Sequence, residues 1–324
     1  MHAVEYAIVG AGAIGSIIGA HLARAGHSVA MIVREHRAAQ LHRNGLRIRG
    51  LGDFAVPVTV ITDASELRRA EVLLVAMKTP GTEAALARLR NTSIDTAFSI
   101  QNGLWKNDVL TAFFGAERVL GSLANTSGEL MPDGDVLFTR NVNLLVGELA
   151  GGLSARAQRI ATSIDASGVR ATAVPDVLAR EWTKFIAWVP LMSLSVTTRA
   201  LTWRYLSEPH SAAVIVNLAR EVAQLARAHG IEPVDDQSLL PQAAILNGGI
   251  EEAIEAVLAV GHQYRVSAPD HRMSSLQDLL AGRPLEVEET LGHAARLATK
   301  LGIPTPLLES FYHLVAAIDR CREG

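Results

Sequence analysis

Short apolar runs alternate with helical apolar patterns over the first half of the chain. Tyr6–Val9 and Ser28–Val33 are short, mostly apolar runs that predict strands, and between them apolar residues recur at helical spacing from Ile14 to Ala25. Gly26 is predicted to end this helix in the left-handed region. The alternation continues with predicted helices at 82–89, 105–114 and 153–167 and predicted strands at 72–77, 97–101, 119–124, 141–146 and 169–174. Strands and helices in turn predict an α/β domain built on a Rossmann-type, doubly wound sheet.

Two other patterns complete the expected architecture. The turn signal Asn44-Gly45 is followed by the segments 46–50 and 54–60, which predict a small β-hairpin inserted in the α/β pattern. From Pro175 onward the apolar spacing is almost entirely helical. Helices are expected at 181–198, 212–229, 249–262 and 274–280, followed by a final pair separated by 302–304. We therefore expect a Rossmann domain over 1–174 and an all-α domain over 175–324.

Three glycines lie between the first predicted strand and the first predicted helix. Gly10, Gly12 and Gly15 have the spacing G-x-G-x-x-G. In this context Gly10 allows a tight turn, Gly12 lets a pyrophosphate approach the backbone, and Gly15 lets the helix pack against the sheet. The helix N-terminus, at Ala13 and Ile14, presents N–H groups to the phosphates. The pattern predicts a dinucleotide site; in the alternative, the glycines serve only packing in some other α/β protein.

The end of the second strand distinguishes the two nicotinamide cofactors. Arg34 stands there, with Arg37 close behind. An arginine at this place can pair with a 2′-phosphate, whereas a carboxylate would accept hydrogen bonds from a ribose 2′-hydroxyl. The sequence therefore favours NADP. Glu35 leaves NAD open if the strand ends one residue later, and Arg34 could be an ordinary surface charge.

Polar side chains follow two of the predicted strands. Lys78 stands at the end of the strand 72–77, and Asn102 follows the strand 97–101. Ligands of open α/β sheets bind beyond the carboxyl ends of the strands, so both residues are expected next to the cofactor or substrate. The alternatives are a surface charge for Lys78 and a turn residue for Asn102.

The composition excludes several classes of function. A net charge of −3 over 324 residues gives no basic field for nucleic acid or an anionic membrane surface. The single cysteine, Cys321, can make no internal disulfide. No apolar run reaches the roughly 20 residues that span a bilayer, and the N-terminal residues lack the features of a signal peptide. Sequence motifs for metal ligands are also missing, so we expect a soluble, cytoplasmic protein without a metal site.

An ordered set of motifs resembles one known family. The motifs are GAGAIG at 10–15, Arg34, LLVAMK ending in Lys78, SIQNG around Asn102, REWTKF around Lys184, and SSLQDLLAGRPLEVEE from Ser274 to Glu289. Together they resemble the ketopantoate reductases, or 2-dehydropantoate 2-reductases, over nearly the whole chain. The resemblance implies a Rossmann domain that binds NADPH, a helical domain, and hydride transfer to the ketone of a 2-oxo acid in pantothenate biosynthesis.

The resemblance also implies roles for individual residues. Lys184 resembles the catalytic lysine, the general acid that protonates the carbonyl oxygen, and Glu286 the glutamate that holds the lysine and binds substrate. Ser274 matches a serine that contacts the substrate carboxylate. Lys78 resembles the lysine at the cofactor ribose, and Asn102 the asparagine near the nicotinamide. From the residues alone, Lys184 could be a snorkelling lysine and Glu286 part of a solvated acidic face.

Two positions depart from the family pattern. The family has asparagines one and two turns after the catalytic lysine, and this chain has Trp188 and Met192. Because a site built to pair a hydroxyl discriminates strongly, this replacement favours a bulkier or more apolar substrate. Two alternatives stay open: an oxidoreductase of the same scaffold acting on a bulkier carbonyl or an imine, and a non-catalytic NADP-binding sensor. A homodimer formed through the helical domain is also expected.

Overall fold

The chain divides into two compact units, which we describe separately. The computed structural model describes residues 2–234 and 239–321. The first unit runs to Asn102 and from Lys106 to Leu178, and the second contains Gly103–Trp105 and the chain from Ala179 onward. Gly103–Trp105 packs with the second unit, where a Cβ on Gly103 would lie 3.0 Å from Thr290 Cγ2. The division at 178 compares with the boundary at 174 expected from the sequence.

The first sheet of the first unit is the predicted doubly wound sheet. Its order is β5-β2-β1-β6-β7, and all its neighbouring strands are parallel. From β1 the chain moves outward to β2 and β5 on one side and to β6 and β7 on the other, so the strand order reverses next to β1. The strands are β1 His2–Val9, β2 Val29–Ile32, β5 Thr59–Ile61, β6 Leu67–Val75 and β7 Ser93–Ser99.

A second sheet was not anticipated from the sequence. It has the order β10-β9-β3-β4, and β8 pairs with β9 in a long antiparallel hairpin. The hairpin predicted at 46–60 is therefore only half right, because β4 pairs with β3 whereas β5, beyond Pro57, joins the first sheet beside β2. The strands are β3 Leu46–Gly50, β4 Phe54–Val56, β8 Leu120–Leu130, β9 Val136–Glu148 and β10 Ala171–Ala173.

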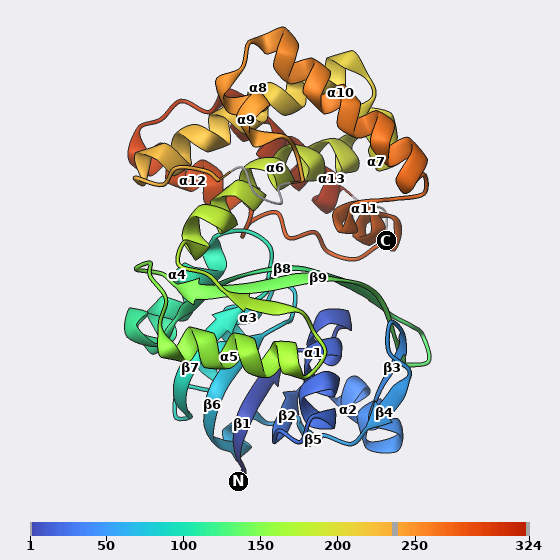
Figure 1. The fold of residues 1–324 in the computed structure, drawn as a ribbon, viewed down its shortest axis with the longest axis vertical. Helices are drawn as coiled ribbons and strands as arrows, with labels where there is room; N and C mark the ends of the chain where they lie inside the picture. The colour runs from blue at the N-terminus through green and yellow to red at the C-terminus, as the bar shows by residue number, and fades with distance from the viewer. Residues whose placement is uncertain (1, 235–238, 322–324) are drawn as a thin grey trace. The chain divides into compact units, whose positions relative to one another are not determined.

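Helix α1 (Ala13–Arg24) lies between the two sheets (Figure 1). Ile17 and Ile18 of α1 share one buried core with Ile8 of the first sheet and with Leu46 and Phe138 of the second. The first glycine-flanked helix thus unites both sheets. The other helices of this part are α2 Glu35–Asn44, α3 Thr82–Ala87, α4 Trp105–Phe114 and α5 Ala155–Ala166, with short 3-10 turns at Ala64–Glu66 and Ala116–Arg118.

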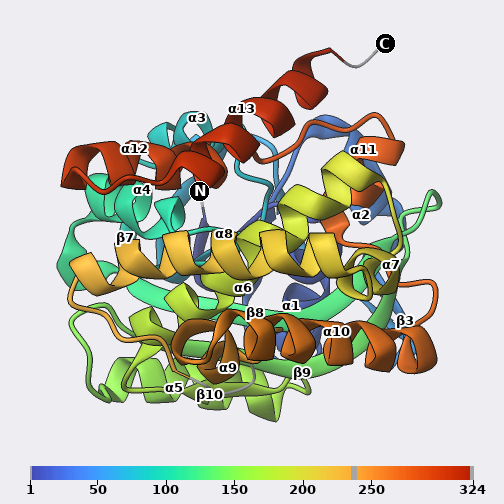
Figure 2. The same ribbon diagram turned by 90° about the horizontal axis from the view of Figure 1, so that it is seen from above.

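In the described part of the second unit the regular elements are all helices, as predicted. Helix α6 (Val177–Thr198) carries apolar residues on nearly all sides, and α8 (Pro209–Ala228) and α10 (Ile250–Ser267) lie side by side (Figure 2). Two short helices, α7 (Thr202–Leu206) and α9 (Gln242–Asn247), were not predicted, because five or six residues are too few to show helical periodicity. The remaining helices are α11 Ser274–Leu280, α12 Leu291–Leu301 and α13 Pro306–Arg320.

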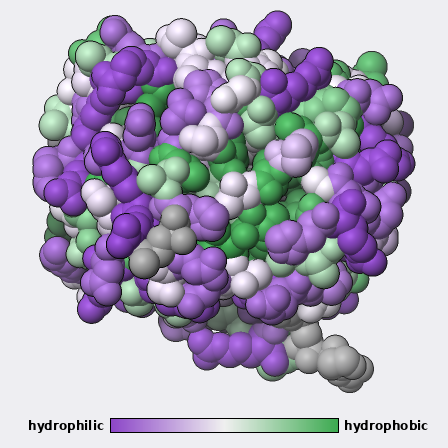
Figure 3. Space-filling view, turned by 90° about the horizontal axis from the view of Figure 1, so that it is seen from below, coloured by the Kyte–Doolittle hydropathy of each residue, from purple (hydrophilic) through white to green (hydrophobic). Residues whose placement is uncertain are grey.

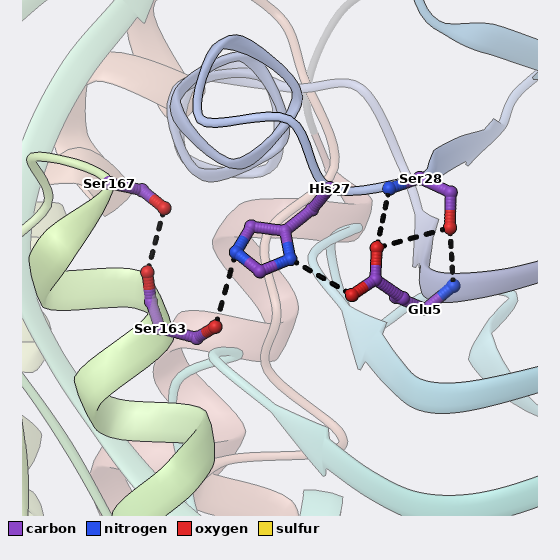
Figure 4. A network of polar contacts seen from close by, with 5 residues as sticks. All are labelled: Glu5, His27, Ser28, Ser163 and Ser167. Atoms are coloured by element: carbon purple, nitrogen blue, oxygen red, sulfur yellow. Dashed lines mark hydrogen bonds and ion pairs between the residues drawn. The ribbon is translucent and has the colours of Figure 1, made fainter.

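A polar network ties the amino end of β1 to α5 (Figure 4). The Glu5 carboxylate accepts the backbone N–H of Ser28 at 2.8 Å and pairs with His27 Nδ1 at 3.1 Å. His27 Nε2 lies 3.2 Å from Ser163 Oγ. These bonds hold the turn between α1 and β2 against the helix that covers the second sheet.

The face seen from below is hydrophilic at its rim, and hydrophobic side chains gather toward its middle (Figure 3). Among residues 2–234 and 239–321, no helix has the length and apolar character to cross a bilayer.

Candidate functional site

The glycine loop shows which glycines the protein itself requires. Gly10 has φ +101°, and a Cβ there would lie 2.8 Å from Met77 N. A Cβ on Gly15 would lie 2.2 Å from Gly10 O. By contrast, the nearest protein atom to a Cβ on Gly12 is Ala76 O at 3.9 Å, an ordinary contact. Packing therefore explains Gly10 and Gly15, whereas Gly12 leaves open space over the backbone.

The N-terminus of α1 opens onto this loop. Gly12 is its N-cap, no side chain accepts a hydrogen bond from the first turn, and the first turn carries no acidic residue. Ala13 and Ile14 are only partly buried. The first N–H groups of a helix have no acceptor within the helix, and they lie at the positive end of its dipole. The loop thus has the space and the N–H donors that the diphosphate of a dinucleotide requires.

The two arginines near the end of β2 have different surroundings. Arg34 is exposed at the N-cap of α2, two residues beyond β2. Arg37 is buried, with 9% of its surface exposed, and it donates to Ala11 O and Gly134 O. Because protein acceptors occupy Arg37, the prediction of NADP now depends on Arg34.

The ends of β6 and β7 lie at the same edge of the sheet as the glycine loop. Lys78 is exposed three residues beyond β6, and Asn102 is partly buried three residues beyond β7. Gln101, which the sequence did not single out, joins these two segments. Its Nε2 donates to Met77 O at 2.9 Å and to Thr82 Oγ1 at 2.7 Å. Its only signal was the place next to Asn102.

In the second unit, Lys184 differs in exposure from its neighbours on α6. From Glu181 to Val196 every side chain of α6 is buried except that of Lys184, which is partly exposed. Aromatic rings surround its position along the helix: Trp182 and Phe185 meet edge to face at 6.2 Å between centroids, and Phe185 stacks on Trp188 at 6.4 Å. A partly exposed ammonium on an otherwise buried stretch of helix is suited to proton transfer.

Trp188 and Met192 belong to the buried core of the second unit. Their exposures are 5% and 1%. They lie one and two turns beyond Lys184, and Ser195 follows on the same side of the helix. Ser195 Oγ lies 3.1 Å from Ser275 Oγ at the start of α11, so a buried hydroxyl pair joins the two helices. The sequence gave no signal for this pair.

The two other residues predicted for the substrate site lie near the ends of elements. Ser274 is the first residue of α11 and is exposed. Glu286 is partly exposed between the buried Leu285 and Val287, and its backbone carbonyl accepts the Thr290 hydroxyl. Among the residues that the structure describes, no group of three or more His, Cys, Asp or Glu could hold a metal ion.

Comparison with protein families gives two matches that together span most of the chain. The model described as Ketopantoate reductase PanE/ApbA matches residues 6–151. The model described as Ketopantoate reductase PanE/ApbA C terminal matches residues 176–319.

Individual proteins agree with these matches. The 2-dehydropantoate 2-reductase of Archaeoglobus fulgidus is 26% identical over 312 residues, which cover 96% of this chain and 97% of the relative. The structure of a PanE/ApbA family ketopantoate reductase from Ralstonia eutropha has a TM-score of 0.82 at 25% identity, covering 97% of this chain and 98% of that one. D-mandelate dehydrogenase, solved with NADH and anilino(oxo)acetate, shares the fold, with a TM-score of 0.79 at 20% identity and coverage of 97% and 98%.

Proposed function

Because the chain belongs to the ketopantoate reductase family, we propose that it is an NADP-dependent oxidoreductase that reduces a 2-oxo acid to a 2-hydroxy acid. The observation that carries the proposal is Lys184, the one side chain of α6 between Glu181 and Val196 that is not fully buried. A protein that only sensed the cofactor would not need such a lysine, so this observation disfavours the sensor alternative.

The proposed mechanism divides the work between the units. The nicotinamide, when bound, supplies the hydride. In the first unit, Gly12, Ala13 and Ile14 would hold the diphosphate by backbone N–H groups, while Lys78 and Asn102 would contact the ribose and the nicotinamide side.

The second unit would act on the carbonyl. Lys184 would donate a proton to the carbonyl oxygen, whose developing negative charge must be stabilised as the hydride arrives. Glu286 would hold Lys184 and bind the substrate. Ser274, exposed at the first position of α11, would donate to the substrate carboxylate.

The preference for NADP is supported by the exposed guanidinium of Arg34 at the end of β2, a suitable partner for a 2′-phosphate. D-mandelate dehydrogenase was solved with NADH, so NADH is the necessary comparator.

A second candidate substrate class is favoured by Trp188 and Met192. The named relatives are 2-dehydropantoate 2-reductases, whereas the ligand in the D-mandelate dehydrogenase structure is an oxo acid that bears an aromatic ring. Large apolar side chains beyond Lys184 provide no hydrogen bond to a substrate hydroxyl, so they support a bulkier 2-oxo acid or a related carbonyl or imine.

Family membership further supports a place in pantothenate biosynthesis and a cytoplasmic location. We also propose a homodimer formed through the helical unit, on which Val266, Leu280 and Leu314 are exposed apolar residues. Light scattering on the purified protein tests the oligomeric state.

The decisive experiment is NADPH oxidation across a panel of 2-oxo acids, with 2-dehydropantoate beside aryl-bearing and branched apolar acids. Turnover of 2-dehydropantoate comparable to that of the named relatives would show that Trp188 and Met192 are tolerated. Turnover of a bulkier acid alone would support the second candidate. No oxidation with any acid, despite NADPH binding, would overturn the proposed reduction.

A further inference from the structure

We propose that Arg37 is a positioning residue that orients the glycine loop for the diphosphate of the dinucleotide; the inference rests on the proposed function. Arg37 is a buried side chain of α2, which the proposed mechanism does not use. Its Nε donates to Ala11 O at 3.2 Å, inside the loop, and its Nη2 donates to Ser16 Oγ at 3.3 Å on α1. The Arg37 guanidinium therefore contacts both the glycine loop and α1, the helix that follows it.

The bond to Ala11 fixes the direction of the next N–H group. The peptide bond between Ala11 and Gly12 is trans. In a trans peptide the C=O and N–H groups point in opposite directions. When Arg37 holds the Ala11 carbonyl on its own side, the Gly12 N–H points to the other side. Gly12 is also the residue over which the structure leaves open space.

The other end of the guanidinium is anchored in the second sheet. Nη1 donates to Gly134 O at 2.8 Å and to Gln40 Oε1 at 3.1 Å. Gly134 has φ +90° in the turn of the β8–β9 hairpin, and a Cβ there would lie 2.9 Å from Nη1. The adjacent Asp135 is buried and pairs with Arg49 and, at 3.5 Å, with Arg47. Ion pairs thus hold the residue that follows the anchoring carbonyl of Gly134.

Burying the charged guanidinium of Arg37 costs free energy, which its hydrogen bonds offset. Burial lowers the pKa of Arg37, and the nearby Asp135 raises it. A buried guanidinium is tolerated because each of its three nitrogens has an acceptor. Since those acceptors belong to the protein, Arg37 does not read the 2′-phosphate. Its effect should be the same for NADPH and NADH, which share the diphosphate.

The test is a titration of NADPH and NADH, followed by fluorescence, against Arg37→Met, which keeps the stem and removes the donors. The matched control is Arg43→Met, an exposed arginine on the same helix. We expect Arg37→Met to raise the Kd of both dinucleotides by the same factor, about tenfold, while kcat at saturating NADPH is kept. Arg37→Lys should recover part of the affinity, and Arg43→Met should change neither Kd. Arg34→Gln is the reference for the opposite pattern, a loss confined to NADPH.

The outcomes separate this inference from the proposed function. Wild-type binding of neither dinucleotide would overturn both. If the wild type binds and folded Arg37→Met binds equally well, or loses affinity for NADPH alone, the positioning role is wrong. Should Arg37→Met fail to fold, Ser16→Ala and Gly134→Ala disturb the same guanidinium from its two ends. Both would then raise the two Kd values together, and unchanged values in both variants would overturn the inference.

Discussion

In the first unit the groups proposed to hold the diphosphate are backbone N–H groups at the N-terminus of α1, whereas in the second unit the groups proposed to act on the substrate are side chains. The glycine loop is shaped by its lack of side chains, with Gly10 and Gly15 in close backbone contact. Lys184 instead is the one partly exposed side chain of α6 between Glu181 and Val196. The difference teaches that a site made of backbone groups depends on the shape of the loop, whereas a site made of side chains depends on the chemistry of single residues.

The largest effect that tests this difference is expected at Lys184. Lys184→Ala should lower kcat by about 10²–10⁴-fold, the usual contribution of a general acid, and leave the Kd of NADPH unchanged. Lys300→Ala, at an exposed lysine of α12, is the control. Stopped-flow assays and NADPH titration measure the two quantities. A variant that keeps most of its turnover would remove the catalytic role and restore the view of a snorkelling lysine.

The glycine loop allows a sharper test, because two of its glycines are required for different reasons. Gly15→Ala should destabilise the protein by about 1–3 kcal/mol through overpacking against Gly10 O. Gly12 has φ −70° and ψ −171°, which alanine adopts freely. Gly12→Ala should therefore melt like the wild type yet bind NADPH about tenfold more weakly, a loss of about 1.4 kcal/mol. Thermal melts measure the stability of both variants, and titrations measure their affinity for NADPH. Wild-type affinity in Gly12→Ala would show that the dinucleotide does not approach the backbone of Gly12.

The smallest effect is expected at Glu5 in β1, the central strand of the first sheet, which lies outside both proposed sites. The Ser28 N–H and the His27 side chain hold the pKa of Glu5 below its ordinary value. A lowered pKa contributes stability that is present above the unfolded value, near 4.5, and is lost as the pH falls through the folded value. Glu5→Gln should thus lower the melting temperature at pH 7, and this difference should shrink toward pH 3.

Because 42% of the Glu5 side chain is exposed, the difference in unfolding free energy at pH 7 should be less than about 1 kcal/mol. Glu83→Gln, at an exposed carboxylate of α3, serves as the control. Dinucleotide affinity should stay constant in Glu5→Gln. An unchanged gap in melting temperature between pH 7 and pH 3 would contradict the role of the carboxylate charge.

The first strand, helix and strand could be predicted because their signals are local. The run before Gly10, the helical spacing after it and the stop at Gly26 all lie within one short stretch, and Gly26 has the expected positive φ. The second sheet could not be predicted in the same way. Ile48 pairs with Val136, and Leu144 with Ala171, across long sequence separations that leave no local pattern.

The candidate site divides along the same line. Residues with distinctive side chains, such as Arg34, Lys78 and Lys184, could be named from motifs and from the family resemblance. Arg37 and Gln101 could not be assigned their partners, because the acceptors include the backbone carbonyls of Ala11, Gly134 and Met77. Every residue has the same backbone carbonyl, whatever its side chain, so no sequence pattern marks which carbonyl accepts the hydrogen bond.

The sequence by itself determined the doubly wound sheet, the helical second unit, the glycine loop and the family, because periodicity, turn residues and ordered motifs are properties of neighbouring positions. Only the tertiary structure decided that β8, β9 and β10 form a second sheet with β3 and β4, and that α1 is enclosed between the sheets. It also decided that Arg37 faces the protein rather than the solvent. These features depend on which distant segments meet, and burial and hydrogen bonding fix that choice only when the whole chain is folded.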